Sequence, residues 1–368
     1  MGNARSQLGT GDTVTQYMLI VVGALVVVLS SMPFVRRAAI RWGFMAQPSA
    51  RGVHTRPTPR LGGVAIYLGC MAALLVFSDR FYVAQVVSML VGATIVSFLG
   101  VWDDRRGLRP LVKLAGQVLA AGILYVTGVQ VGFLRQPLLD LGATMLWIVG
   151  ITNALNLLDN MDGLSSGVAT VACIFFLLLA VMSDQYLVSS LAAALLGACV
   201  GFLYYNFNPA TIFMGDSGSL FIGFMLAALG IKLRFPDNVA FVTWMIPVVV
   251  LGLPVFDTTL VVISRLRRGL NPLSSPGKDH VSHRLVAMGA TQREAVLTLY
   301  LVCCALGVVA MFLTQASVAE GYFIGALLVA FAGYALWRLE QVKGDYQVRT
   351  PAPPASPAAP GEALEERE

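Results

Sequence analysis

The stretch NFNPATIFMGDSGS, from Asn206 to Ser219, is a polar loop with one carboxylate between two strongly apolar runs. Small residues surround Asp216 on both sides, so the backbone can approach a ligand closely. The next run, 220–233, is predicted to be a helix that starts at Ser219, and the unpaired N–H groups of a helix start favour an anion such as phosphate. A carboxylate beside such a helix start suits a magnesium–phosphate site. The loop alone fits equally well a Gly/Ser turn in which Asp216 is the N-cap.

The composition excludes most classes of soluble protein. Of the 368 residues, 57% are hydrophobic and only 12% charged, and the mean hydropathy is +0.75. Soluble domains carry about 25% charged residues, so the sequence indicates a polytopic membrane protein. Its basic residues are spread over separate loops without interleaved aromatic residues, which argues against nucleic acid as a partner. The five cysteines lie in apolar runs without metal-ligand spacing, so neither a zinc site nor a disulfide framework is predicted.

The predicted fold is all-α, with about eleven transmembrane helices. Apolar runs of roughly 20 residues are the signal, and the ninth contains Pro247 and Pro254, which predict a kink. The spans are expected at 17–35, 61–79, 82–101, 113–131, 141–158, 165–183, 186–205, 218–233, 239–263, 295–314 and 320–337.

The distribution of basic residues predicts the orientation. With the N-terminus outside and the C-terminus in the cytoplasm, all but five of the 25 lysines and arginines lie on the cytoplasmic side, as the positive-inside rule requires. The motif-bearing loops then all face the cytoplasm, at the inner or plasma membrane. The expected organisation is a polar leader at 1–16, a transmembrane domain at 17–338 and a disordered Pro/Ala-rich cytoplasmic tail at 339–368.

Adjacent carboxylates open the loop 102–112. Asp103 and Asp104 follow a transmembrane run directly, where such a pair can hold a divalent cation or serve as base and metal ligand. They also fit solvated loop acids balanced by neighbouring arginines. Lys113 fits a phosphate ligand and a positive-inside anchor equally well.

A second polar row closes the fifth predicted helix. Asn156, Asp159 and Asp162 are three residues apart, so a continuing helix would align them on one face. With Gly163 behind it, this row favours a nucleotide or metal face over a helix cap. Asn156 would lie at membrane depth, where an amide needs a partner.

The last motif combines an intramembrane acid with a basic loop. Asp257 lies in an apolar run and is a functional candidate by default, with a buried partner as the alternative. The loop after it carries His280, His283 and Arg284, which favour phosphate contacts over an ordinary basic loop. A zinc site is disfavoured, because neither Cys nor a third His is near. The remaining histidine, His54, is assigned no role.

Taken in order, these motifs resemble the polyprenyl-phosphate N-acetylhexosamine-1-phosphate transferases, a glycosyltransferase family 4-like group. The resemblance covers roughly residues 45–300, and the broken histidine run His280-Val281-Ser282-His283 is similar to the undecaprenyl/decaprenyl-phosphate N-acetylglucosaminyl-1-phosphate transferase branch. In the branch that makes the muramoyl-pentapeptide lipid, the run has three histidines. Ser282 leaves the role of a third histidine unfilled. The motifs that carry the resemblance are Pro57-x-Pro59-x-x-Gly62-Gly63, Asp103-Asp104 with Lys113, Asn156-x-x-Asp159-x-x-Asp162-Gly163, Gly215-Asp216-x-Gly218-Ser219, Pro254-x-x-Asp257-Thr258 and Asp279-His280-x-x-His283-Arg284.

The resemblance implies a reaction and a set of roles. A UDP-sugar would give its sugar-1-phosphate to a polyprenyl phosphate in the bilayer and release UMP, as the first step of a lipid-linked cell-envelope glycan such as lipopolysaccharide or teichoic acid. Mg²⁺, or Mn²⁺ in its place, is the implied cofactor, and a homodimer is an expected assembly. The implied catalytic residues are Asp103, Asp104, Asp162 and Asp216, of which Asp216, Asp104 and Asp162 are the implied metal ligands. The implied substrate-binding residues are Lys113, Asn156, Asp159, Asp257, His280, His283 and Arg284.

Other functions remain open on the sequence. The donor sugar nucleotide fits UDP-N-acetylglucosamine best, with another UDP-N-acetylhexosamine or UDP-muramoyl-pentapeptide as alternatives. A transporter of an anionic substrate would place ionisable groups at the membrane centre and show repeated halves, whereas these acids gather at one surface without a visible repeat. A non-catalytic scaffold would not explain why so many acids and two histidines converge on one face.

Overall fold

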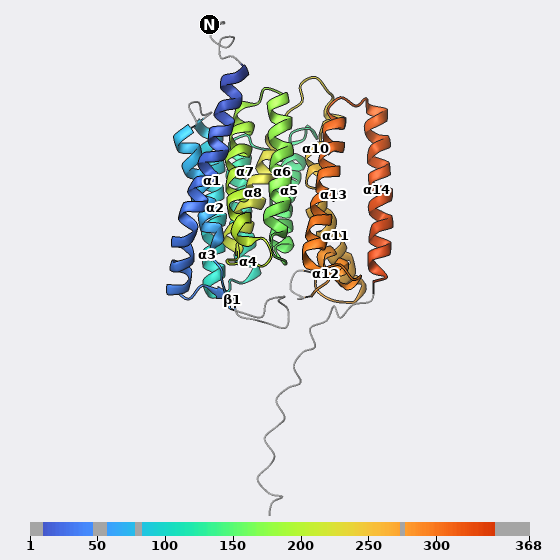
Figure 1. The fold of residues 1–368 in the computed structure, drawn as a ribbon. Coiled ribbons are helices and arrows are strands. Elements are labelled where there is room, and N and C mark those ends of the chain that lie inside the picture. Colours follow the sequence, from blue (N-terminus) through green and yellow to red (C-terminus); the bar gives the residue numbers. More distant parts are fainter. Residues whose placement is uncertain (1–9, 47–56, 78–82, 273–276, 343–368) are drawn as a thin grey trace, which may run out of the picture.

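The computed structural model describes residues 10–46, 57–77, 83–272 and 277–342. The leader before Thr10, the segment that contains His54 and the predicted tail after Val342 lie outside these residues. The described chain is helical apart from one small antiparallel pair, β1 (Met45–Ala46) and β2 (Thr58–Pro59), in which Met45 pairs with Pro59. The helices run side by side through the body (Figure 1).

Every predicted run overlaps a helix, and the run 239–263 overlaps three, α9, α10 and α11. Among the described residues, seven helices are long and apolar enough to cross a membrane, or eight if one bent pair counts as a single span, rather than the eleven predicted; α2 and α4 are shorter apolar helices. The helices are α1 (Thr10–Arg41), α2 (Gly62–Phe77), α3 (Val83–Arg106), α4 (Pro110–Val126), α5 (Pro137–Leu158), α6 (Leu164–Met182), α7 (Tyr186–Asn206), α8 (Asp216–Lys232), α9 (Ala240–Thr243), α10 (Met245–Val250), α11 (Gly252–Arg267), α12 (Val281–Ala287), α13 (Gln292–Leu313) and α14 (Val318–Glu340).

The predicted kink in the ninth span is confirmed. The segment Ala240–Val250 and helix α11 meet at 73° around Leu251. Pro247 and Pro254 lie on either side of this break, and proline removes a helix hydrogen bond and crowds the preceding turn. The bend directs α11 toward the end of the bundle that carries α12 (Figure 1).

Helix α8 lies at the centre of the bundle. Residues 216–231 of α8 are all buried, and α8 packs against α3, α5 and α2. A helix that is apolar all round must be covered on every side, and small residues permit this. Gly223 lies against the backbone of Thr152 on α5, and Gly100 on α3 lies against the backbone of Asp216, where a side chain would collide.

Three boundaries near the motifs and the leader differ from the sequence predictions. Asp103 and Asp104 lie in the last turn of α3 rather than in a loop, and α8 begins at Asp216 rather than Ser219. Helix α1 begins at Thr10, so its start extends into the predicted leader. The fifth helix ends at Leu158, as predicted, and Gly163, with a φ of 76°, is the N-cap of α6.

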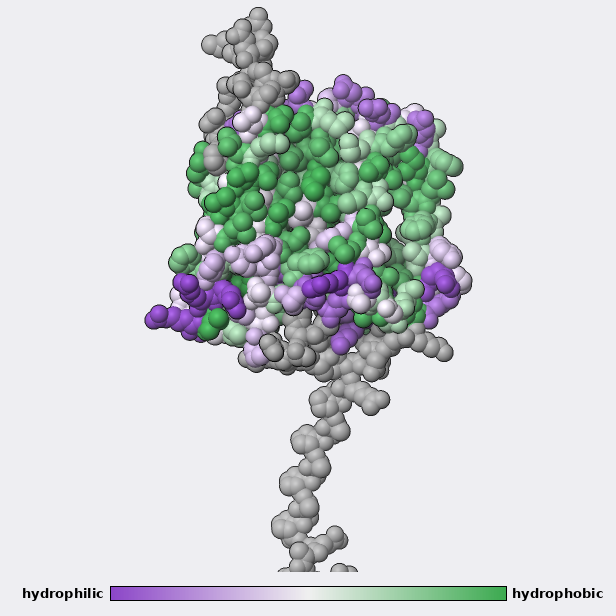
Figure 2. Space-filling view, viewed as in Figure 1, coloured by the Kyte–Doolittle hydropathy of each residue, from purple (hydrophilic) through white to green (hydrophobic). Residues whose placement is uncertain are grey.

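The surface carries a broad apolar belt. Figure 2 shows hydrophobic residues over the middle of the visible face, with hydrophilic residues gathered toward its two ends. A long run of exposed apolar residues is what a lipid-facing helix requires. The helix ends that carry the sequence motifs all lie at the lower end in Figure 1, where α12 and β1 also lie. The chain is therefore built as a multi-pass membrane protein with its motifs gathered at one end.

Candidate active site

Asp104 connects α3 to the start of α8. Its Oδ1 accepts a hydrogen bond from the backbone N–H of Asp216 at 3.0 Å, and its Oδ2 accepts one from the N–H of Ser217 at 3.2 Å. The helix start does attract an anion, as the sequence suggested, and that anion is the Asp104 carboxylate. Gly100, one turn earlier on α3, permits this contact because it lies directly on the Asp216 backbone. The alternative that Asp216 itself caps the helix is wrong, since Asp216 is the first helical residue and no side chain caps at Gly215.

Arg60 bridges two of the carboxylates. Its Nε lies 3.0 Å from Asp104 Oδ1, and one terminal nitrogen lies 2.9 Å from Asp216 Oδ1. Arg60 follows β2 and pairs with Phe213 in the loop before α8, so backbone contacts hold it beside the acids. Burial alone would lower the pKa of the Arg60 guanidinium. The neighbouring carboxylates of Asp104 and Asp216 outweigh this effect, and the pKa is raised above its ordinary value.

Lys113 links the other pair of acids. Its Nζ lies 2.8 Å from Asp103 Oδ2 and 2.5 Å from Asp216 Oδ2. Asp103 is itself held at the start of the α3–α4 connection, because its Oδ1 accepts the backbone N–H of Leu108. The ammonium of Lys113 thus lies where a bound cation would be shared by Asp103 and Asp216. The two cations and the three acids form the acidic cluster, defined here as Asp103, Asp104, Asp216, Lys113 and Arg60.

The predicted row of Asn156, Asp159 and Asp162 does not form one helix face. The helix ends before Asp159, so the three side chains diverge. Asn156 donates to Ser219 Oγ at 2.8 Å, which supplies the partner that its amide needs. Asp162 Oδ2 instead accepts the backbone N–H of Ala210 at 2.9 Å and Nδ2 of Asn208 at 3.2 Å, and so fixes the loop before α8.

Asp159 lies next to the acidic cluster. Burial raises the pKa of its carboxyl to about 7, the charge of Arg60 lowers it, and the carboxylates of Asp216 and Asp104 raise it further. Part of its population is therefore protonated near neutral pH, in contrast to an ordinary aspartate. A carboxyl of this kind can exchange a proton or accept a cation in its place.

Asp257 and His280 form a buried pair. Asp257 Oδ2 lies 2.7 Å from His280 Nδ1, and Asp257 Oδ1 accepts the backbone N–H of Val281 at 2.7 Å. Both side chains are nearly inaccessible, at 1% and 6% exposed. Asp257 thus has the buried partner that was the alternative to a direct substrate contact. The pair orients the His280 ring and fixes the first turn of α12.

His283 lies close to His280 and is neutral at pH 7. The two ring centroids are 6.2 Å apart. Burial, together with the charges of His280 and Lys278, lowers the pKa of His283 to about 4. A contact between His283 and a phosphate would therefore be that of a neutral hydrogen-bond donor rather than that of a cation.

Arg284 has surroundings that disfavour the predicted phosphate contact. Its guanidinium is buried, donates to Ser264 Oγ at 2.8 Å and to Glu340 Oε1 at 2.7 Å, and also contacts the carbonyl oxygens of Asp279 and Leu339. These contacts join α12 to α11 and to the end of α14. In this structure Arg284 holds the loop together, and its donors point into the protein.

Several residues of the site were not singled out from the sequence. Arg60 belongs to a quoted motif but counted there only as a topological charge. Ser282 donates to Asn160 Oδ1 at 2.7 Å and so joins α12 to the turn that contains Asp159. Tyr300 donates to the carbonyl oxygen of Gly163 from α13. Since these contacts join segments more than 100 residues apart, no local pattern could have found them.

The acids do not form a ready metal cage. Within residues 10–46, 57–77, 83–272 and 277–342, no three His, Cys, Asp or Glu side chains come together as a metal-ligating group. Asp103 and Asp216 nonetheless share one cation, Lys113, and carboxylate oxygens are the ligands that Mg²⁺ prefers. Mg²⁺ usually keeps several waters and phosphate ligands, so two carboxylates fit such an ion.

Comparison with known proteins shows the family of the chain. Residues 86–234, which carry most of the acidic cluster, match the model of glycosyl transferase family 4. A probable undecaprenyl-phosphate N-acetylglucosaminyl 1-phosphate transferase of Bacillus subtilis is 38% identical over 317 residues, which cover 84% of this chain and 88% of the relative. The chain belongs to the polyprenyl-phosphate N-acetylhexosamine-1-phosphate transferase family.

Other relatives show how broad this transferase family is. The decaprenyl-phosphate N-acetylglucosaminephosphotransferase of Mycolicibacterium smegmatis is 34% identical over 334 residues, covering 81% of this chain and 82% of the relative. A phospho-N-acetylmuramoyl-pentapeptide-transferase of Desulforudis audaxviator is 30% identical over 313 residues, covering 76% and 91%. Both branches named by the sequence resemblance are thus related to this transferase over most of its length.

Proposed function

We propose that this transferase moves N-acetylglucosamine 1-phosphate from UDP-N-acetylglucosamine to a polyprenyl phosphate in the membrane and releases UMP. The observation that carries the proposal is the acidic cluster, in which two cationic side chains bind three carboxylates at one end of a membrane bundle. The relatives of 33–38% identity over most of the chain are named as N-acetylglucosaminyl 1-phosphate transferases of undecaprenyl and decaprenyl phosphate. We place the site at the cytoplasmic surface of the plasma membrane, following the distribution of basic residues.

The proposed step is a single phosphoryl transfer. A bond forms between an oxygen of the lipid phosphate and the sugar-side phosphorus of the donor, while the bond from that phosphorus to the oxygen of UMP breaks. A phosphate monoester has a second pKa of about 6, so the lipid phosphate is already largely ionised at pH 7 and the attack needs no general base. The role of the protein is then to position the phosphates and balance their charge.

The residues of the acidic cluster supply that positioning. Arg60 and Lys113 each hold two carboxylates in the structure, and their cationic groups are placed to turn toward a donor pyrophosphate or the lipid phosphate. Asp104 and Asp162 hold the start of α8 and the loop before it, so that Asp216 keeps its place. Asp257 sets the orientation of His280, which we assign to the donor phosphates or sugar.

Mg²⁺, or Mn²⁺ in its place, is the proposed cofactor. Asp216 would hold it first, with Asp103 as the neighbour that shares the same cation in the structure. Asp104, Asp159 and Asp162 surround these two as further candidate ligands. When bound, the ion would neutralise the pyrophosphate and the charge that develops on UMP.

The test is a donor comparison with purified protein in detergent, a polyprenyl phosphate and Mg²⁺. UMP release is measured with UDP-N-acetylglucosamine, UDP-N-acetylgalactosamine and UDP-muramoyl-pentapeptide. The proposal expects lipid-dependent release that is fastest with UDP-N-acetylglucosamine. Faster UMP release with UDP-muramoyl-pentapeptide would assign the chain to the branch that makes the muramoyl-pentapeptide lipid. UMP release with none of the donors would refute the transferase function and favour a transporter.

A further inference from the structure

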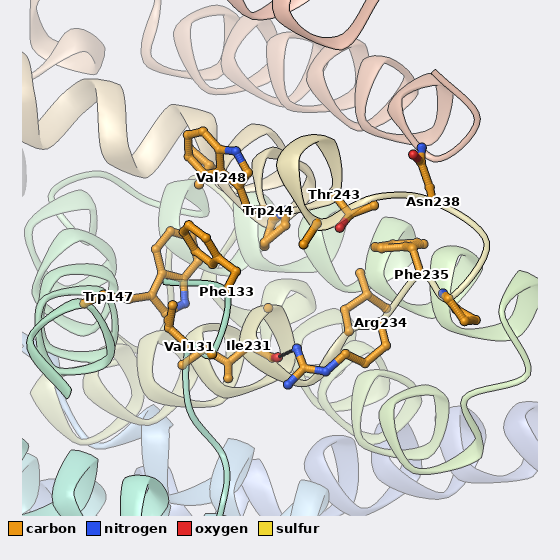
Figure 3. A pocket seen from close by; sticks show the side chains of 17 residues that line it. Val131, Phe133, Trp147, Ile231, Arg234, Phe235, Asn238, Thr243, Trp244 and Val248 are labelled. Carbon is orange, nitrogen blue, oxygen red and sulfur yellow. Dashed lines mark hydrogen bonds between the residues drawn. The ribbon is translucent and has the colours of Figure 1, made fainter. Parts of the chain in front are cut away.

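A large cavity lies at the end of the bundle opposite to the acidic cluster. Its volume is about 630 Å³, within the range of about 300–1,000 Å³ that is usual for small-molecule sites. The segment after α4, the first half of α5, the end of α8 and the helices α9 and α10 form its walls (Figure 3). None of its lining residues belongs to the site described above.

The cavity exists because α8 is short. The 17 residues of α8 span about 25 Å, less than the apolar core of a bilayer, about 30 Å. Gly230, near the end of α8, lies against Trp147 of α5, and α5 continues from Trp147 back to Pro137. These ten residues extend about 15 Å past the level of Gly230, so a hollow remains beyond α8 at membrane depth.

The walls are aromatic and their polar tips are satisfied. Phe133 and Trp244 stack with ring centroids 6.1 Å apart. The indole N–H of Trp147 donates to the carbonyl oxygen of Ala227, and that of Trp244 donates to the carbonyl oxygen of Phe241. In Figure 3 the Trp147, Phe133 and Trp244 side chains lie on one side of the cavity and Arg234 and Phe235 on the other. The rings therefore offer apolar contact without a demand for hydrogen bonds.

Two cations lie at this end of α8 without a carboxylate. Arg234 lines the cavity and donates to the carbonyl oxygen of Ile231 at 2.6 Å, and Lys232 donates to Gln85 Oε1 at 2.7 Å. Within the described part of the chain, neither lies within 4.0 Å of an Asp or Glu oxygen. The hydrogen bond to Ile231 at the end of α8 uses only one of the five N–H donors of Arg234. The other donors and the positive charge can bind an anion.

We propose that this cavity binds an anionic phospholipid, with one acyl chain between Trp147 and Trp244 and the phosphate at Arg234 and Lys232. An apolar hollow at membrane depth is filled by hydrocarbon rather than by water, and the cations select a negatively charged headgroup. The lipid is not the acceptor substrate, because the length of α8 separates Arg234 from Asp216. Its role is to support the end of α8 and the bent helix pair. This inference does not depend on the proposed function.

The test uses tryptophan quenching in purified, delipidated protein. Phosphatidylglycerol and phosphatidylcholine with brominated acyl chains are titrated in detergent. The chain has five tryptophans, and replacement of Trp147 and Trp244 by Phe identifies the signal of the cavity. We expect saturable quenching that requires at least five-fold less phosphatidylglycerol than phosphatidylcholine. The variants R234Q and K232Q should reduce that preference, and A143F should abolish the quenching that depends on Trp147 and Trp244 by filling the cavity.

R135Q is the matched control, since Arg135 is exposed in the loop before α5 and does not line the cavity. It should bind phosphatidylglycerol like the parent protein. Each variant is first checked for a monodisperse elution profile and an unchanged melting temperature without added lipid. Three results would overturn the proposal: equal quenching of Trp147 and Trp244 by the two lipids, quenching of these two that persists in A143F, or displacement of phosphatidylglycerol by equimolar polyprenyl phosphate.

Discussion

At the scale of single residues, the site is built from shared ionic contacts. Arg60 and Lys113 each contact two carboxylates, and Asp216 takes part in both contacts. Because Asp216 lies between two cations, its carboxylate stays charged despite its burial. Replacing one of these residues therefore changes the charge balance of the whole group.

The Asp257–His280 pair predicts non-additive effects on catalysis. Both D257N and H280Q should reduce the kcat of UMP release, and the double variant should be little worse than H280Q alone, because Asp257 acts by orienting the His280 ring. Residues that act through one contact show coupling energies of about 0.5–3 kcal/mol. Initial rates of the four proteins measure the coupling. Strictly multiplicative losses would mean that Asp257 acts independently of His280.

His283 predicts a dependence of stability on pH. Its folded pKa of about 4 lies below its ordinary value of 6.5, so the folded state resists protonation. Stability from this residue is full above pH 6.5 and is lost as the pH falls toward 4, by at most about 1.4 kcal/mol per pH unit. The melting temperature in detergent should fall in that window. In H283Q the fall should be smaller, and an identical pH profile would contradict the assignment.

At this scale the sequence predicted which residues belong to the site better than it predicted the partners that each of them contacts. Asp103, Asp104, Lys113 and Asp216 were expected to work together, and they lie in one cluster. Arg284 was expected at a phosphate, and it is buried with its donors directed into the protein. Its residue type does not distinguish the two roles, because an arginine binds a carboxylate or a carbonyl oxygen as readily as a phosphate.

At the scale of elements, the close approach of helices positions the acids. Gly100 brings α3 onto the first turn of α8, and Gly63 brings α2 onto the backbone of Gly218. Neither contact leaves room for a Cβ atom. These glycines have no functional side chain, but they set how closely α3 and α2 approach the start of α8.

G100A should reduce both stability and activity. The added methyl group would collide with the Asp216 backbone and move Asp104 away from the start of α8. Overpacking of this kind costs about 1–3 kcal/mol. Thermal unfolding and UMP release measure the two effects. G122A on α4 is the control, since no atom lies within 4 Å of its added methyl group, and it should behave like the parent protein.

Helix positions were predictable from apolar runs, whereas their ends were not. Every predicted run overlaps a helix, but α3 continues through Asp104 and α8 begins at Asp216 rather than Ser219. Hydropathy falls where charged residues begin, and a helix can continue past that point if its polar groups find partners. For Asp104 the partner is the start of α8, which is distant in sequence.

At the scale of the whole molecule, the two ends of the bundle carry different features. The motifs gather at the end that carries α12 (Figure 1), and the aromatic cavity is lined by the opposite end of α8. Helix α14 has only Gly321 buried and is tied to the motif end by Arg284 and Glu340. The shortness of α8 links both features, because it starts at the acids and ends at the cavity.

The predicted orientation can be tested with single cysteines in intact cells. Gln136 lies at the exposed start of α5, away from the motif end, and Ala287 is exposed at the end of α12. A membrane-impermeant maleimide should label Q136C in intact cells and A287C only after lysis. The parent protein, which retains exposed Cys304 on the apolar helix α13, gives the background. Labelling of A287C alone in intact cells would reverse the orientation.

The central claim is that the bond broken lies between the two phosphates of the donor. The most direct measurement uses UDP-N-acetylglucosamine labelled with ³²P in the sugar-side phosphate, together with a polyprenyl phosphate and Mg²⁺. The account predicts that the label enters the lipid in equal amount to the UMP formed, and that D216N reduces the rate by about 10²–10³-fold, as for loss of one preorganised charge. Label that remains in released UDP while the sugar alone enters the lipid would contradict it.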